Sequence, residues 1–214
     1  MLHVLTKEHS LVNDYLAELR NVDIQQDRAR FRRNIERIGE IIAYETSKHL
    51  ARKMTTITTP LGVHESHILD KQPVLATVLR AGLPMHQGFL NYYDRADNAY
   101  VSAYRKHTSK HEFEIVVEYL AAPDINNRTL ILIDPMLATG RSMYLTYQAL
   151  LTKGKPSQVI VAGVIASQQG IEFIQQHMPE AKIFIGDIDP ELDATSYIVP
   201  GLGDAGDLSF GEKV

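Results

Sequence analysis

The sequence lacks cysteine altogether, so disulfide bonds, thiolate metal sites and a cysteine nucleophile are all excluded. It also lacks an apolar run of membrane-spanning length, and charges and histidines interrupt its opening segment, MLHVLTKEHSLVND. We therefore expect neither an export signal nor a membrane anchor, and a cytoplasmic location. Neither sign of charge dominates, and a net charge of -4 gives no general attraction to nucleic acid or to an anionic membrane. The balance favours small-molecule chemistry.

Several catalytic motifs are missing as well. The sequence contains no GxSxG, HExxH or Walker A pattern, so nothing in it supports a serine hydrolase, a zinc protease or an NTPase. Two histidine pairs, His64 with His67 and His107 with His111, have spacings that suit a metal, but no third ligand lies near either pair. We interpret them as surface histidines and expect no protein-built metal site.

Hydrophobic residues make up 44% of the chain, which is enough for a substantial core. We expect one domain over 1–214, with a helical N-terminal arm at 1–53 and the core at 74–214. The arm contains apolar residues at helical spacing from Arg28 to about Leu50. These residues are Phe31, Ile35, Ile38 and Ile42.

Continuous apolar segments alternate with helical patterns through the remaining sequence. The segments PVLATVLR, TLILID, SQVIVAGVIA and KIFIGDI each read as a buried strand. This alternation predicts an α/β fold with a doubly wound parallel sheet. TTITTP reads as a short strand and residues 64–71 as a turn or hairpin, while NAYVSAYR and FEIVVEYL read as two strands joined by a polar connection, KHTSKHE. We interpret this connection as a candidate lid.

The turn DPMLATGRS follows the strand TLILID and precedes a helix. Ligands of open parallel sheets bind beyond the carboxyl ends of the strands, which is where this turn lies. Thr139, Gly140 and Ser142 offer hydroxyls and free N–H groups at the positive end of a helix, which suits a phosphate. Asp134 could accept hydrogen bonds from sugar hydroxyls. On physical grounds alone, an ordinary strand-to-helix loop with an N-cap serine is an equal alternative.

A second glycine-rich segment, YIVPGLGDAGDLSFG, lies near the C-terminal end. Its GLGDAG has the letters of the dinucleotide fingerprint GxGxxG, but the helix, further strand and later acidic residue of that fold do not follow it. The glycines suit a backbone folded tightly around a small planar ligand. The alternative is a glycine-rich tail that merely ends the fold.

Both segments resemble those of a known family. DPMLATGRS resembles the phosphoribosyl-diphosphate signature of the type I phosphoribosyltransferases, most closely the form found in uracil phosphoribosyltransferases, and YIVPGLGDAGD resembles the uracil-binding segment of the latter. LRAGLPM resembles the family's diphosphate-binding turn. The resemblance runs from about Leu75 onward and implies the type I phosphoribosyltransferase fold, with a β-hairpin or flexible-loop extension.

The resemblance also implies roles for individual residues. Asp204 and Arg105 are the expected catalytic residues. The expected contacts of 5-phosphoribosyl diphosphate (PRPP) are Arg80, Arg105, Asp134, Pro135, Met136, Leu137, Ala138, Thr139, Gly140, Arg141, Ser142 and Asp204. Uracil is expected to hydrogen-bond with main-chain groups at Ile198, Gly203, Asp204 and Ala205. The sequence departs from the family at Arg141, where a second glycine is usual, and at Lys106 to His111, where the family's loop is acidic.

The reaction implied is the transfer of a phosphoribosyl group from PRPP to uracil, forming UMP and diphosphate in pyrimidine salvage. Mg²⁺ is expected to arrive with the diphosphate and to touch few protein groups. The resemblance implies a homo-oligomer and leaves open whether GTP is an effector. Two alternatives remain: a regulator of this fold that binds RNA, and a transferase acting on another base.

Overall fold

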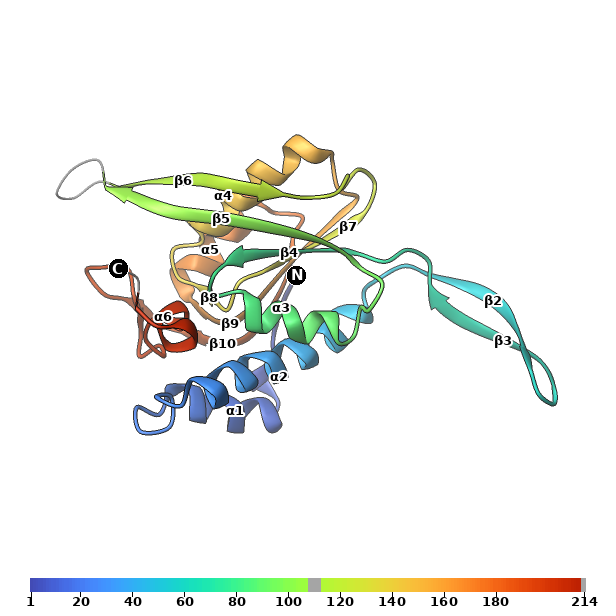
Figure 1. The fold of residues 1–214 in the computed structure, drawn as a ribbon, viewed down its shortest axis with the longest axis horizontal. Helices are drawn as coiled ribbons and strands as arrows, with labels where there is room; N and C mark the ends of the chain where they lie inside the picture. Colours follow the sequence, from blue (N-terminus) through green and yellow to red (C-terminus); the bar gives the residue numbers. More distant parts are fainter. Residues whose placement is uncertain (108–112, 213–214) are drawn as a thin grey trace.

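A computed structural model of the chain describes residues 1–107 and 113–212, and shows a twisted sheet with helices on both faces (Figure 1). The helices, in chain order, are η1 (Leu5–Lys7), α1 (Leu11–Arg20), α2 (Arg28–Ser47), α3 (Leu83–Leu90), α4 (Arg141–Leu150), η2 (Leu151–Lys153), α5 (Gln168–His177) and α6 (Ala205–Phe210).

The main sheet is almost entirely parallel, and only β5 and β6 run antiparallel within the part of the chain that the structure describes. Its strands, in spatial order, are β1 (Leu2–Val4), β10 (Lys182–Asp189), β9 (Gln158–Ser167), β7 (Thr129–Ile133), β4 (Val74–Leu79), β5 (Asp97–His107) and β6 (Phe113–Ala121), with β8 (Met136–Leu137) also paired to β9. The predicted α/β class with a parallel sheet is confirmed.

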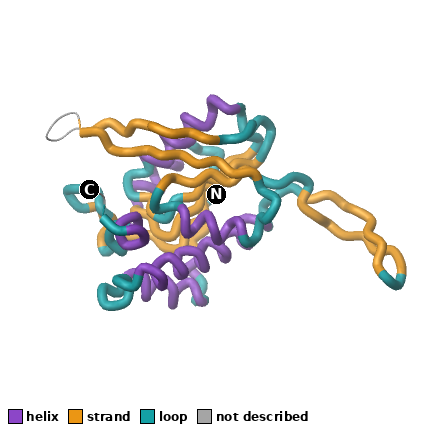
Figure 2. Tube along the Cα trace, viewed as in Figure 1, coloured by secondary structure: helices purple, strands orange, loops and turns teal. Residues whose placement is uncertain are grey.

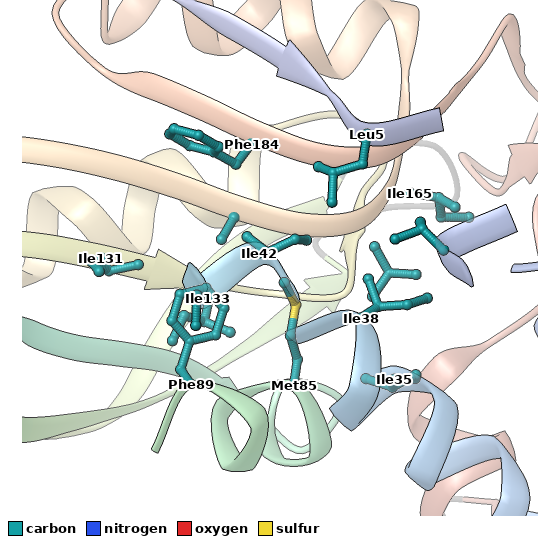
Figure 3. Close-up of a cluster of buried hydrophobic side chains, with 14 of the residues drawn as sticks. Leu5, Ile35, Ile38, Ile42, Met85, Phe89, Ile131, Ile133, Ile165 and Phe184 are labelled. Atoms are coloured by element: carbon teal, nitrogen blue, oxygen red, sulfur yellow. The ribbon is translucent and has the colours of Figure 1, made fainter. Parts of the chain in front are cut away.

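Each face of the sheet has its own apolar core. On one face, α1, α2 and α3 pack against the sheet, and Ile35, Ile38 and Ile42 of α2 are completely buried. Figure 3 shows these side chains beside Met85 and Phe89 of α3. On the other face, α4 and α5 cover the sheet. The N-terminal helices therefore share a core with the sheet, which supports the proposal of one domain.

The N-terminal arm is not purely helical. Strand β1 joins the edge of the main sheet, with Leu2 opposite Ile183 and Val4 opposite Ile185 of β10. A three-residue strand is too short to show an alternating pattern, so its sequence gave no signal.

A second hairpin, β2 (Arg52–Thr59) and β3 (Gly62–Leu69), extends away from the main sheet (Figure 2). Residues 64–71, expected to form a turn or hairpin, mostly belong to β3, and the turn lies earlier, between Thr59 and Gly62. Neither face of this ribbon is buried, so its strands lack the apolar alternation from which their ends could be read.

Strands β5 and β6 are confirmed, but the candidate lid between them includes 108–112, which lie outside the described residues. Across the described ranges, no helix is both long and apolar enough to cross a membrane.

Candidate active site

A cavity of about 500 Å³ lies beyond the carboxyl ends of β4 and β7. Residues from three regions that are distant in sequence line it: 78–81 at the end of β4, most of 134–143 after β7, and 196–197 with 203–206 near the C-terminal end. Ser142 and Ala205, from the two resembling segments, are both on its wall. The structure therefore brings the glycine-rich segment and the turn before α4 to the same cavity.

The turn from Ala138 to Ser142 leads into α4. Gly140 is the residue before the helix and has φ of +74°, in the left-handed region. A Cβ atom there would lie 2.9 Å from the carbonyl oxygen of Gly170, so glycine is required for two independent reasons. The first N–H groups of α4 have no carbonyl partner within the helix, and the cavity lies at this end. The arrangement suits an anion.

Ser167 supports this turn from behind. It is the last residue of β9, and its hydroxyl donates to the carbonyl oxygen of Ala138 at 2.6 Å. The hydroxyl oxygen of Ser167 also accepts the N–H of Gly170 at 2.9 Å, which caps α5. Ser167 is fully buried. One hydroxyl thus fixes the turn to the helix behind it.

Asp134 lies at the tip of β7, half-buried in the cavity wall. Loss of water around the carboxylate raises its pKa to about 7, and the N–H of Met136, which donates to it at 3.4 Å, only partly opposes this effect. Around neutral pH the group exchanges between a form that only accepts hydrogen bonds and one that can donate.

Arg80 enters the cavity wall from the turn after β4, where the Leu79–Arg80 peptide is cis. Its Nη2 donates to Oδ1 of Asp207 at 3.2 Å and to the carbonyl oxygen of Gly211 at 3.1 Å. Its Nε makes no hydrogen bond within the described residues. The α6 region therefore orients the guanidinium without using all of its donors.

Asp204 is the N-cap residue of α6 and also lines the cavity. Its Oδ1 accepts the N–H groups of Gly206 at 2.8 Å and of Asp207 at 2.9 Å, an N-cap. Its second oxygen is not used in this cap. Gly203, Asp204 and Ala205 all line the cavity, so the cap holds one carboxylate and several main-chain groups at a fixed place on the wall.

Comparison with known proteins decides the family. The family model for uracil phosphoribosyltransferase matches residues 5–212. The chain belongs to the uracil phosphoribosyltransferase family. A uracil phosphoribosyltransferase of Porphyromonas gingivalis is 56% identical over 211 residues, 98% of each chain. One of Pyrococcus furiosus is 37% identical over 206 residues, 95% of this chain and 87% of its own. The solved structure of the AQ2163 protein from Aquifex aeolicus has a TM-score of 0.88 at 26% identity, with both chains fully covered.

Most of the residues that the sequence predicted for a uracil phosphoribosyltransferase site lie on the cavity wall. They are Arg80, Asp134, Met136, Leu137, Ala138, Thr139, Gly140, Ser142, Gly203, Asp204 and Ala205. The structure thus gathers them in one place, and their roles remain proposals.

Three predicted residues lie off this wall. Pro135 is buried, and its carbonyl oxygen accepts from the N–H groups of Val164 and Ile165. Arg141 has an exposed side chain at the start of α4. Ile198 is buried in β12 (Ile198–Val199), which pairs with β11 (Glu191–Leu192).

Arg105 belongs to β5, and its main chain pairs with that of Ile115 in β6. The prediction for its side chain lies outside what the structure describes.

Ser196 and Tyr197 also line the cavity of this uracil phosphoribosyltransferase family member, and sequence reasoning missed them. Asp193 holds their turn by accepting the N–H groups of Thr195 and Tyr197, both at 2.8 Å. These bonds, first that from Tyr197, lower the pKa of Asp193. The Asp-x-Thr spacing before YIVPG is typical of such an Asx-turn, and was the available signal.

Proposed function

We propose that this chain transfers the 5-phosphoribosyl group from PRPP to uracil, forming UMP and diphosphate. The observation that supports the proposal is the shared cavity, which is lined both by the start of α4 and by the glycine-rich segment from Gly203 to Gly206. A phosphorylated sugar on the first wall would meet a flat base on the second. Membership of the uracil phosphoribosyltransferase family supports the same reaction.

The α4 side of the cavity suits PRPP. The turn from Thr139 to Ser142 would bind the 5-phosphate through N–H groups and hydroxyls. Asp134 would accept hydrogen bonds from the ribose hydroxyls, and Arg80 would face the diphosphate. As C1 develops positive charge, stabilisation of the departing diphosphate is the main electrostatic task. Arg80 provides a fixed positive charge for it.

A substitution at Ser167 tests the proposed PRPP-binding side of the cavity. We expect Ser167→Ala to raise KM for PRPP roughly tenfold, because it leaves the Ala138 carbonyl and the Gly170 N–H unpaired at a cost of about 1 to 3 kcal/mol. KM for uracil should change much less. Steady-state kinetics with each substrate varied measures both. Thr152→Ala is the control, since its hydroxyl donates to Ala149 on an exposed surface. Equal KM values in the wild type and Ser167→Ala would contradict the supporting role.

The facing wall suits uracil. Main-chain N–H and C=O groups from Gly203 to Ala205 would pair with O2, N3–H and O4 of the base. Cytosine has an acceptor at N3 and a donor at position 4, so each mismatch would leave buried groups unpaired at about 1 to 3 kcal/mol. Asp204 would face the ribose and diphosphate between the two walls.

Mg²⁺ fits this site as a companion of the substrate. No group of three or more His, Cys, Asp or Glu suited to a metal occurs among the described residues. Mg²⁺ commonly binds through substrate phosphates, waters and one or two carboxylates. Asp134 and Asp204 are available on the wall for that purpose. The ion would neutralise charge on the departing diphosphate.

A base panel tests the proposed function. Purified protein is incubated with radiolabelled PRPP, Mg²⁺ and uracil, cytosine, hypoxanthine or adenine in turn. We expect UMP from uracil and little product from the other bases. A preferred product from another base would point to a different transferase. Salt-dependent RNA binding with no UMP formed would favour a regulator of the same fold.

We also propose that the protein is a homo-oligomer, with the β2–β3 hairpin contributing to the interface. The hairpin exposes Met54, Leu61 and Val63 to solvent, and Leu61 is 100% exposed. Two-stranded hairpins are marginally stable alone in water, and exposed apolar clusters often mark contacts.

The Leu61→Glu/Val63→Glu double variant should weaken self-association about tenfold or more, because charges would be buried at the interface. Multi-angle light scattering over a dilution series measures this. Val22→Glu changes a similarly exposed valine in the α1–α2 loop, and should leave association unchanged. A monomeric wild type, or a double variant that associates as the wild type does, would contradict the proposal.

Two further proposals are GTP as an effector and a cytoplasmic location. Adding GTP to the uracil assay tests the first, and an unchanged rate would dismiss it. Fractionation of the source cells tests the second.

A further inference from the structure

An ion-pair cluster contacts the glycine-rich segment at Gly201 but does not line the cavity. Arg20, the last residue of α1, binds Asp189 through two bonds, Nη1 to Oδ2 at 2.8 Å and Nη2 to Oδ1 at 2.9 Å. Its Nη2 also binds Oδ2 of Asp187 at 3.0 Å. Burial opposes the charge on Arg20, but the hydrogen bonds and charges of the two aspartates outweigh it and raise the pKa of the guanidinium. Arg20 therefore keeps its positive charge beside the two carboxyl groups.

Both members of the main pair also hold the main chain of one residue of the glycine-rich segment, Gly201. Nη1 of Arg20 donates to the carbonyl oxygen of Gly201 at 2.9 Å. The N–H of Gly201 donates to Oδ2 of Asp189 at 3.2 Å. Asp189 is only 4% exposed, so water competes little for these bonds. Gly201 is therefore fixed at its N–H and its C=O by one ion pair.

Gln25 holds the next residue. It lies between α1 and α2, is buried, and its Nε2 donates to the carbonyl oxygens of Leu19 at 2.8 Å and Leu202 at 3.2 Å. Leu19 belongs to α1, so the side chain ties the segment to the same helix that supplies Arg20. Two separate polar contacts thus join α1 to consecutive residues.

The glycine-rich segment depends on hydrogen bonds from other parts of the chain to fix its conformation. Gly201 has φ of +62° and a Cβ atom there would overlap the carbonyl oxygen of Ile198, while Gly203 has φ of +91°. Glycine has no side chain to anchor it, and it loses more backbone freedom on ordering than any other residue. The stretch that follows, 203–206, lines the cavity. A shift at Gly201 or Leu202 would therefore displace the adjoining main chain that lines the cavity.

We propose that Arg20, Asp189 and Gln25 are positioning residues for the nucleobase: they hold the main chain of Gly201 and Leu202 so that the adjoining residues present a fixed pattern of donors and acceptors to uracil. This inference rests on the proposed function. It gives the first helix a specific part in base recognition, although α1 contributes no residue to the lining of the cavity.

The test uses two variants that differ in their risk to folding. Arg20→Lys keeps the charge but loses the two-pronged contact with Asp189 and the geometry needed to reach Gly201 as well. Gln25→Met keeps the approximate length of the side chain, removes both hydrogen bonds and changes no charge. We expect each to raise KM for uracil about tenfold or more, since small misplacements can cost up to a hundredfold. KM for PRPP should stay within about twofold of the wild type, because that wall is untouched.

Arg30→Lys is the matched control. Arg30 of α2 makes a two-bond ion pair with Glu18 of α1, away from the segment, and the same substitution there should leave both KM values unchanged. Thermal melting of all variants checks the fold. Equal increases in both KM values, or unchanged uracil KM in folded Arg20→Lys and Gln25→Met, would overturn the inference.

Hydrogen–deuterium exchange separates this inference from the proposed function. If Arg20 and Gln25 position the segment, peptides covering 198–206 should exchange faster in both variants than in the wild type, with or without turnover. Wild-type protein that forms no UMP would contradict the proposed function alone. If the wild type forms UMP but exchange in Arg20→Lys and Gln25→Met equals that of the wild type, the inference alone is contradicted.

Discussion

Asp204→Asn is expected to lower kcat by about a hundredfold or more, with little change in the free energy of unfolding. Asparagine caps helices about as well as aspartate, so the oxygen that accepts the N–H groups of Gly206 and Asp207 is retained. What is lost is the negative charge facing the cavity. Steady-state kinetics and thermal melting on the same preparation measure the two effects.

Asp27→Asn provides the matched control for this substitution. Asp27 caps α2 by accepting the N–H groups of Ala29 and Arg30, and it does not line the cavity. The Asp27→Asn variant should keep the activity and the stability of the wild type. Near-normal turnover in Asp204→Asn would refute a catalytic role for the charge. A large loss of stability would instead show that the charge itself is needed by the fold.

Asp134→Asn should reduce kcat/KM for PRPP by about a hundredfold or more, while making the free protein more stable at alkaline pH. The carboxyl group has a pKa of about 7 in the folded protein against an ordinary value of 3.8, so the folded state holds its proton more tightly. This contribution favours folding at acidic pH and is lost as the pH rises toward 7. Above pH 7 the half-buried charge destabilises the folded state, and asparagine removes it.

The measurement is thermal or denaturant unfolding of both proteins without ligand at several pH values from 4 to 8.5. We expect the variant's advantage to be small at pH 4 and to reach at least about 1 kcal/mol at pH 8. Asp124→Asn is the control, since its exposed carboxylate also accepts the N–H of the residue two positions on, Asn126. A constant difference across pH would contradict the raised pKa. Retained activity would contradict the proposed contact with ribose.

The two walls of the cavity could be predicted because each is a local pattern. Thr139 to Ser142 follow an apolar strand and precede a helix, and the glycines around Asp204 imply close main-chain approach to a ligand. Each pattern is also compatible with an ordinary loop. Resemblance to a family was needed to choose between a ligand-binding segment and such a loop. That both face one cavity is visible only in the structure.

The supporting residues could not be predicted in this way. Arg20 and Gly201 are 181 positions apart, and Ser167 reaches Ala138 from 29 positions away. A side chain that hydrogen-bonds to a distant main-chain group leaves no spacing or periodicity in the sequence. Such contacts depend on which strands become neighbours in the sheet, and strand order is a property of the whole fold.

The pairing of β1 with β10 has a consequence for how the molecule reaches its native state. Residues 2–4 find their partners only at 183–185, so this edge of the sheet cannot close until most of the polypeptide is available. Contacts with such large sequence separation carry a loop-closure cost and slow the search. We therefore expect the α2–α3 helical layer to consolidate early, and the edge strand to join in a late step of refolding.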